Sequence, residues 1–213
     1  MSALQIVGRS SSLFTRLPLI LAEELEVPYE LVPIYDMSVL GPEVYGGNPA
    51  LKLPILRTPD GTLFGALNIC RAIEERSAHR ARVVWPEELR SVLSRNAQEL
   101  VWHAMGAQVQ LVMGTVVGKL PADNVYFTKA SSGLDGSLQW LDARVTDVIS
   151  ELPGPRRISV FEASLFCLVE HLVFRKTFNV QTYPALVRFT QEFAERPSAK
   201  RTAYRFDTPP PPA

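Results

Sequence analysis

The sequence has few cysteines and histidines, and no excess of charge of either sign: 2 Cys, 3 His, and 22 basic against 22 acidic side chains in 213 residues. Cys70 and Cys167 lie far apart, so they indicate neither a disulfide framework nor metal-ligand spacing. We therefore expect a reducing cytoplasm and no metal. His79, His103 and His171 show no spacing of a metal site or a Ser-His pair. Because balanced charge gives no long-range basic field, we expect no nucleic-acid partner.

Long apolar runs are also missing. The most apolar stretch, residues 17–25, is interrupted by Glu23 and Glu24, and nothing approaches the ~20 apolar residues that cross a bilayer. The start, residues 1–5, has no cationic lead, so we expect neither a signal peptide nor a membrane-spanning segment. A composition of 46% hydrophobic and 21% charged residues is typical of folded, soluble proteins.

The first third alternates strand and helix patterns. Residues 4–7 form an apolar run ended by a glycine, which predicts a buried strand. Apolar residues at helical spacing over 13–25 predict a helix, and 29–34 alternate as a second strand does. Residues 53–65 carry Asp-Gly between two short apolar runs and predict a hairpin. Residues 66–76 have helical periodicity and predict a second helix. The order is strand-helix-strand, then strand-strand-helix.

Everything after this region has helical periodicity. We predict helices over 88–118 and 134–152, a helix that begins at a capping box from Ser159 to Glu162, and a helix that Pro184 opens and Pro197 closes. The predicted organisation is residues 1–80 as a first, mixed domain, 81–87 as a linker, 88–206 as an all-helical domain and 207–213 as a disordered, proline-rich tail.

Five short motifs occur in an order that resembles the glutathione transferase family. They are Asn48–Pro54, Asp60-Gly61 before a helix with Ile69, Ser159–Glu162, Tyr183-Pro184 and Arg196-Pro197. The resemblance is to the cytosolic type, bacterial beta- and zeta-like members. It implies an α/β thioredoxin-like N-terminal domain with a mixed four-stranded sheet, followed by an all-α helical bundle. It also implies a homodimer and a cytoplasmic role in detoxification.

The resemblance implies a site that stabilises the thiolate of glutathione, since only the thiolate is a competent nucleophile. The loop after the first strand would supply the donors. Aligned with the Arg-Ser-Ser-Cys loop of zeta-like members, it gives Ser11 the catalytic, thiol-contacting position, with Ser10 and Ser12 close behind. Aligned instead with beta-like members, Phe14 replaces their cysteine and Ser10 or Thr15 is the nearest hydroxyl. The alternative is a serine loop that only caps the helix.

Other parts of glutathione would bind at Lys52, Leu53, Pro54, Gly65 and Ala66. The resemblance implies a cis Pro54, so that the main chain of Leu53 pairs with the extended peptide. Lys52 would face the glycyl carboxylate, or be a solvated loop charge. Family members place an acidic or amide residue and then Ser where this chain has Gly65-Ala66, so a hydroxyl that grips the γ-glutamyl carboxylate is missing.

The family's electrophile pocket would be lined here by Phe14, Trp102 and Met105, with Met113 also a candidate, although such residues are more often core. We expect a glutathione transferase-like enzyme that uses glutathione as a substrate, needs no metal and attacks small apolar electrophiles. The alternative is a non-catalytic protein of the same fold that binds ligands or proteins. A thiol-disulfide oxidoreductase is disfavoured, because the loop lacks Cys-x-x-Cys.

Overall fold

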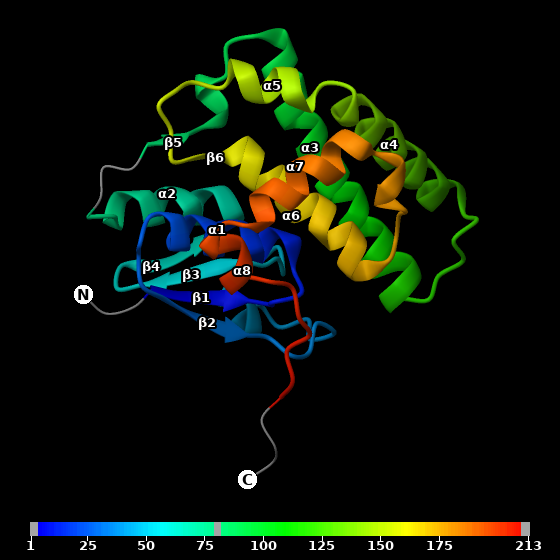
Figure 1. Ribbon diagram of the computed structural model, residues 1–213. Coiled ribbons are helices and arrows are strands. Elements are labelled where there is room, and N and C mark those ends of the chain that lie inside the picture. The colour runs from blue at the N-terminus through cyan, green and yellow to red at the C-terminus, as the bar shows by residue number, and fades with distance from the viewer. Residues whose placement is uncertain (1–3, 79–81, 210–213) are drawn as a thin grey trace. The chain divides into compact units, whose positions relative to one another are not determined.

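A computed structural model describes residues 4–78 and 82–209 of the chain (Figure 1). The chain divides into two compact units, Met1–Ala81 with Glu195–Ala213, and Arg82–Ala194. The first unit is therefore built from both ends of the chain, whereas the sequence assigns residues 195–206 to the helical domain. The expectations for residues 1–3, His79, Ala81 of the linker and 210–213 lie outside the described residues.

A four-stranded sheet forms the first unit, in the order β2-β1-β3-β4. Strand β1 (Leu4–Gly8) pairs parallel with β2 (Tyr29–Pro33) and antiparallel with β3 (Ile55–Thr58). Strand β4 (Gly61–Phe64) completes the predicted hairpin with β3. The mixed four-stranded sheet predicted from the sequence is confirmed.

Helices and a loop cover the two faces of this sheet. Helices α1 (Leu13–Glu24) and α2 (Ala66–Arg76) pack against each other along one face (Figure 1). The other face buries a cluster of Val7, Ile34, Tyr45 and Ile55, in which Tyr45 comes from the short helix η1 (Pro42–Tyr45). Because successive side chains of a strand point to opposite faces of the sheet, β1 and β3 contribute side chains to the packing on both faces.

The C-terminal part of the first unit is longer and more structured than the sequence predicts. The helix predicted between Pro184 and Pro197 is α7 (Pro184–Ala194), which ends before Pro197 as predicted. Pro197 is also the first residue of a further helix, α8 (Pro197–Arg201), a position where the missing amide hydrogen of proline costs no hydrogen bond. Helix α8 packs against α1. Asp207, predicted to begin a disordered tail, instead accepts a hydrogen bond from the Ser10 backbone at 2.8 Å.

The second unit is mainly helical, as predicted, but its helices differ from the expected ones in two places. The helix predicted over 134–152 begins earlier, at Val125, and is interrupted after Asp142, where α5 follows as a separate helix. The elements are η2 (Pro86–Glu88), α3 (Val92–Leu111), η3 (Val112–Val117), α4 (Val125–Asp142), α5 (Val145–Glu151), α6 (Val160–Arg175), η4 (Val180–Thr182) and α7 (Pro184–Ala194).

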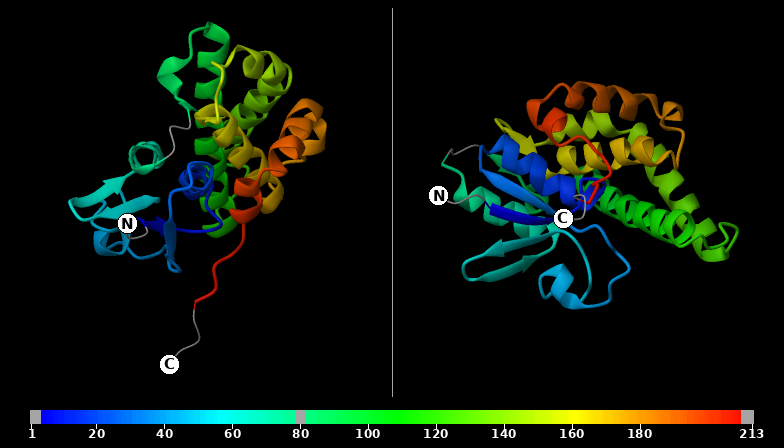
Figure 2. Two further views of the ribbon diagram at one scale, coloured as in Figure 1. Left: turned by 60° about the vertical axis from the view of Figure 1, so that its left-hand side comes forward. Right: turned by 90° about the horizontal axis from the view of Figure 1, so that it is seen from below.

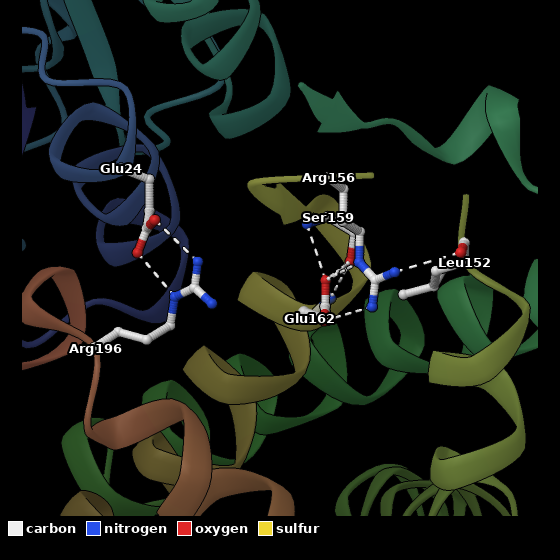
Figure 3. A network of polar contacts seen from close by, with 6 residues as sticks. All are labelled: Glu24, Leu152, Arg156, Ser159, Glu162 and Arg196. Atoms are coloured by element: carbon white, nitrogen blue, oxygen red, sulfur yellow. Dashed lines mark hydrogen bonds and ion pairs between the residues drawn. The ribbon is translucent and has the colours of Figure 1, made fainter. Parts of the chain in front are cut away.

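The second unit is not entirely helical. Strands β5 (Val83–Val84) and β6 (Ile158–Ser159) pair in parallel, a correction to the all-helical prediction. Strand β6 leads directly into α6, whose predicted capping box is confirmed: the Ser159 hydroxyl accepts from the Glu162 amide at 3.0 Å and the Glu162 carboxylate accepts from the Ser159 amide at 3.0 Å (Figure 3). Arg156 also donates twice to this carboxylate.

One helical stretch among the described residues, Val92–Val117, is long and apolar enough to cross a membrane by length and composition, with a mean hydropathy of 1.3. No such stretch was predicted from the sequence. A core helix of a soluble protein meets the same criterion, and α3 packs extensively against α4 and α6 within its own unit. The stretch is therefore only weak evidence for a membrane span.

Candidate functional site

Three predicted site segments meet at one end of the first unit's sheet. Val7 of β1 is paired with Ile55 of β3. This pair is the last of the ladder: β1 continues through Gly8 into the serine loop, and Leu53-Pro54 directly precedes β3, so both segments lie at this end of the sheet. The Gly65 amide donates to the Pro54 carbonyl at 3.3 Å, which brings the start of α2 to the same place. The pairing of β1, β3 and β4 thus gathers the serine loop, the Leu53 main chain and the α2 N-terminus.

The Leu53-Pro54 peptide bond is cis, as predicted. Among residues 4–78 and 82–209, neither the amide nor the carbonyl of Leu53 has a hydrogen-bond partner. Asn48, which is buried, shapes the approach to it: its side-chain amide donates to the Lys52 carbonyl at 2.9 Å and its oxygen accepts from the Ala50 amide at 3.0 Å. An extended ligand strand could pair with Leu53 at this point.

The serine loop is held from α1. The Ser12 hydroxyl accepts from the Thr15 amide at 3.3 Å, so Ser12 is the N-cap of α1. The Thr15 hydroxyl in turn accepts from the Arg9 amide at 3.4 Å. Thr15 packs so closely on Gly8 that a Cβ at Gly8 would lie 2.5 Å from it, so the end of β1 requires a glycine. Ser12 is committed to the helix, and the expectation of a capping role holds for this serine.

Ser10 and Ser11 are both buried, at 6% and 2% exposure. Within the described part of the chain, the Ser10 hydroxyl has no hydrogen-bond partner, whereas the Ser10 amide donates to Asp207. Buried polar groups are nearly always paired, so an unpaired buried hydroxyl is a candidate donor to a ligand. The structure thus separates the three serines that the sequence could not tell apart: one caps a helix, one is buried and unpaired at its hydroxyl, and one is the most buried.

The start of α2 offers backbone amides but no side-chain group. Gly65 is its N-cap, with φ of 87°, a conformation that favours glycine, and it makes no side-chain cap hydrogen bond. The first amides of a helix have no partner within it and favour an anion. Asn68, one turn along, donates to the Phe64 carbonyl at 3.0 Å. Its amide is therefore engaged with the backbone of the hairpin.

The other predicted site residues are placed as follows. Lys52 is exposed, and Phe14 and Trp102 are half-buried on α1 and α3. Met105 is fully buried, while Met113 is 42% exposed. Cys70 and Cys167 are both free and buried. No group of three or more His, Cys, Asp or Glu side chains suited to a metal occurs among the residues that the structure describes.

The side-chain contacts of Asn48 and Asp207 at this end of the sheet were not predicted from the sequence. Asn48 was noted only as part of a motif, and its hydrogen bonds were not predicted, although an Asn-Pro pair is itself typical of a turn. No local sequence pattern indicates the contact of Asp207, because its partner Ser10 lies 197 residues earlier in the chain.

Comparison with solved structures defines the class of the fold. A glutathione S-transferase from Methylobacillus flagellatus KT, solved with glutathione bound, is 20% identical and superposes with a TM-score of 0.75 over 95% of this chain and 100% of its own. A second, from Methylobacterium radiotolerans JCM 2831 in complex with glutathione sulfonate, is 17% identical, with a TM-score of 0.71 over 100% of both chains. The fold is therefore thioredoxin-like in its first unit and helical in the remainder, as predicted.

The sequence itself carries the same signal over a shorter range. Residues 11–76 match the family model of the glutathione S-transferase N-terminal domain. No curated protein matches the sequence. Residues 11–76 therefore carry the sequence signal of the family's N-terminal domain, and the solved structures show the fold of the whole chain.

Proposed function

We propose that this chain binds glutathione and activates its thiol for attack on small apolar electrophiles. The observation that carries the proposal is the main chain of Leu53, whose amide and carbonyl are without partners in the described residues, at the end of the sheet where the serine loop begins. The cysteinyl part of glutathione is a short extended peptide that would pair there. The domain match over residues 11–76 and the two relatives with bound glutathione or glutathione sulfonate support the proposal.

Ser11 is the proposed thiol-contacting residue, with Ser10 and Ser12 next to it. A free thiol has a pKa of about 8.5, so it is mostly protonated at neutral pH. A hydroxyl donor together with the α1 N-terminus would favour the thiolate, since the dipole and the first amides of a helix stabilise an anion. The unpaired hydroxyl of Ser10 makes this residue the second candidate. Ser12 would contribute by capping the helix.

The two carboxylates of glutathione would bind on either side. Lys52 is the proposed partner of the glycyl carboxylate, and the first amides of α2 after Gly65-Ala66 would receive the γ-glutamyl carboxylate. Without the serine hydroxyl usual in the family, the second contact would be weaker. A lost hydrogen bond to a charged group costs about 1.5–3 kcal/mol, or about one to two decades of affinity.

Phe14, half-buried on the helix that follows the serine loop, is the proposed contact of the electrophile in the first unit. In the reaction the thiol gives its proton to solvent, the sulfur forms a bond to the electrophilic carbon, and the leaving group departs with the electrons of its bond to that carbon. With a chlorinated nitrobenzene, the leaving group is chloride.

Titration calorimetry with glutathione, followed by a conjugation assay with a chlorinated nitrobenzene, tests the proposal. We expect measurable binding and conjugation, and at least a tenfold loss of turnover in Ser11→Ala, since about 1.4 kcal/mol of thiolate stabilisation corresponds to tenfold. Ser131→Ala on α4, far along the chain from the loop, is the control. Full activity in Ser11→Ala would move the role to Ser10, which Ser10→Ala then tests.

The missing hydroxyl at Ala66 favours a second function, a non-catalytic protein of the same fold that binds ligands or other proteins. Ala66→Ser discriminates the two, because it returns a hydroxyl to the start of α2. If the γ-glutamyl carboxylate binds there, Ala66→Ser tightens glutathione binding by about tenfold or more, and Ala143→Ser, an exposed position of the second unit, leaves it unchanged. No glutathione binding in either variant or the parent favours the second function.

We also propose that the protein is a cytoplasmic homodimer that acts in detoxification, on the resemblance to the family. Light scattering after gel filtration tests the assembly: a mass near twice 23.7 kDa is expected, and a mass near 23.7 kDa contradicts it.

A further inference from the structure

The C-terminal strap, residues 195–209, runs back along α1 from the end of this helix to the loop before it. At the α1 C-terminus, the buried Glu24 accepts from Arg196 Nε and Nη2, both at 2.9 Å (Figure 3). Arg196, the residue directly before α8, therefore anchors the start of the strap to α1. The path of the strap, drawn in red, can be followed in Figure 2.

A second anchor lies in the middle of α1. Arg16 is 2% exposed and donates through Nη2 to the Ala199 carbonyl at 3.0 Å and through Nε to the Thr202 hydroxyl at 3.4 Å. Its guanidinium also lies over the Tyr204 ring, 4.3 Å from the centroid. The contacts of the strap thus lie progressively nearer the N-terminus of α1. The residues after Tyr204 therefore reach the serine loop, which precedes this helix.

At the end of this path Asp207 meets the loop itself. The Ser10 amide donates to Asp207 Oδ2 at 2.8 Å. A hydrogen bond from a backbone amide to a carboxylate is short and stronger than a neutral one. Arg9 and Ser12, on either side, are held to α1 by hydrogen bonds with Thr15, whereas Ser10, among the described residues, is hydrogen-bonded only to the strap.

We infer that Asp207 is a positioning residue for the proposed thiol site, holding the Ser10-Ser11 turn through the Ser10 amide. The inference rests on the proposed function, because it assigns a purpose to the turn that the function uses. The role belongs to the hydrogen bond rather than to the charge, since a carboxylate close to the sulfur would by itself oppose the thiolate. Asn at this position would keep an acceptor oxygen and remove the charge, so it separates the two effects.

Amide hydrogen exchange of Ser10, measured by NMR in the full chain, is the first test. In Asp207→Ala we expect exchange of the Ser10 amide to accelerate at least about tenfold, the factor that the loss of a charged hydrogen bond gives. Asp207→Asn should stay within about threefold of the parent, because its side-chain oxygen still accepts. Glu195→Ala is the matched control on the same strap, where the carboxylate is exposed and pairs only with Lys200 in the described contacts.

Conjugation kinetics with glutathione form the second test, after urea midpoints have shown that the variants are folded. We expect Asp207→Ala to lower kcat by at least about fivefold with the KM for the electrophile unchanged, and Asp207→Asn to restore most of kcat. Unchanged exchange in Asp207→Ala overturns the inference, and so does accelerated exchange with an unchanged kcat. Equal losses in the Ala and Asn variants also overturn it, since the hydrogen bond would then not be the cause.

The two tests keep this inference apart from the proposed function. If the parent chain neither binds nor conjugates glutathione, the proposed function fails and the thiol-site role fails with it. The exchange comparison still decides whether Asp207 holds the turn, because it needs no glutathione.

Discussion

At the scale of single residues, Glu24 shows how the first unit stabilises a charge away from water. Its side chain is 2% exposed and receives the bidentate Arg196 guanidinium together with the Ser198 hydroxyl. Removing one partner of such a pair lowers the free energy of unfolding by more than the net contribution of the intact pair, because a buried charge is left less well compensated. The pair is therefore a sensitive point of the fold.

We expect Arg196→Ala to lower the free energy of unfolding by about 3 kcal/mol, measured by urea denaturation. Lys200→Ala removes an ion pair from the same strap, but Lys200 and Glu195 are 59% and 79% exposed, so its effect should stay below about 1 kcal/mol. Similar losses in both variants would show that Glu24 does not depend on its guanidinium partner.

Tyr183 predicts a dependence of stability on pH. Burial, and then the hydrogen bond to the Asp135 carboxylate, raise its pKa to about 12 from the ordinary 10.0. Between these values the unfolded chain has lost the phenolic proton and the folded chain keeps it. Tyr183 therefore contributes its full stabilisation of the folded state below pH 10, and this stabilisation is lost as the pH rises toward 12.

Urea titrations between pH 9 and pH 12 should therefore give a steeper loss of stability for the parent than for Tyr183→Phe. Tyr29, whose pKa is also raised by burial and by Glu23, acts in the same direction and leaves a residual slope in the variant. Identical slopes in parent and variant would mean that Tyr183 titrates alike in the folded and unfolded chains.

At the scale of elements, the capping box of α6 is the best-defined local signal in the second unit. Ser159 is 1% exposed, its hydroxyl and the Glu162 carboxylate satisfy each other's amides, and Arg156 pairs with the same carboxylate at 3.0 Å (Figure 3). We expect Ser159→Ala to lower the free energy of unfolding by about 1–2 kcal/mol in thermal or urea unfolding.

Ser150→Ala is the comparison for this cap. The Ser150 hydroxyl is exposed and donates to the Asp147 carbonyl one turn earlier, so its loss should change stability by less than about 0.5 kcal/mol. A Ser159→Ala variant as stable as Ser150→Ala would show that the box adds nothing to the folded state.

The elements also show where sequence patterns succeed. The four strands of the first unit and its helices α1 and α2 were predicted because each carries a clear period and a glycine or proline boundary. The α4 N-terminus was missed since Val125 and Tyr126, its first residues, are 81% and 56% exposed and form no apolar stripe. Strands β5 and β6 have two residues each, too few for any period.

The candidate site divides in the same way. The Leu53-Pro54 segment and the serine loop were found because their motifs are local. The assignment of Ser12 as the cap, the unpaired Ser10 hydroxyl and the Asp207 contact depend on side-chain geometry or on partners far along the chain, which no local pattern encodes.

At the scale of the whole molecule, the first unit cannot be completed until the chain has passed through the second. Its C-terminal strap contributes partners to two buried charged side chains of α1, Glu24 and Arg16. A chain that ends at Ala194 loses these partners together, at about 3 kcal/mol for each buried charge left less compensated. That sum is comparable to the total stability of an ordinary domain, about 5–15 kcal/mol.

We therefore expect the chain ending at Ala194 to lose most of the hydrogen-exchange protection of β1 and β3, measured by mass spectrometry of peptides covering Leu4–Gly8 and Ile55–Thr58. A chain ending at Pro209 keeps every described strap contact and should match the full chain. Protection in β1 and β3 that survives truncation at Ala194 would contradict the prediction. It would mean that the sheet and α1 fold without the strap, and that the buried charges of α1 find water or other partners.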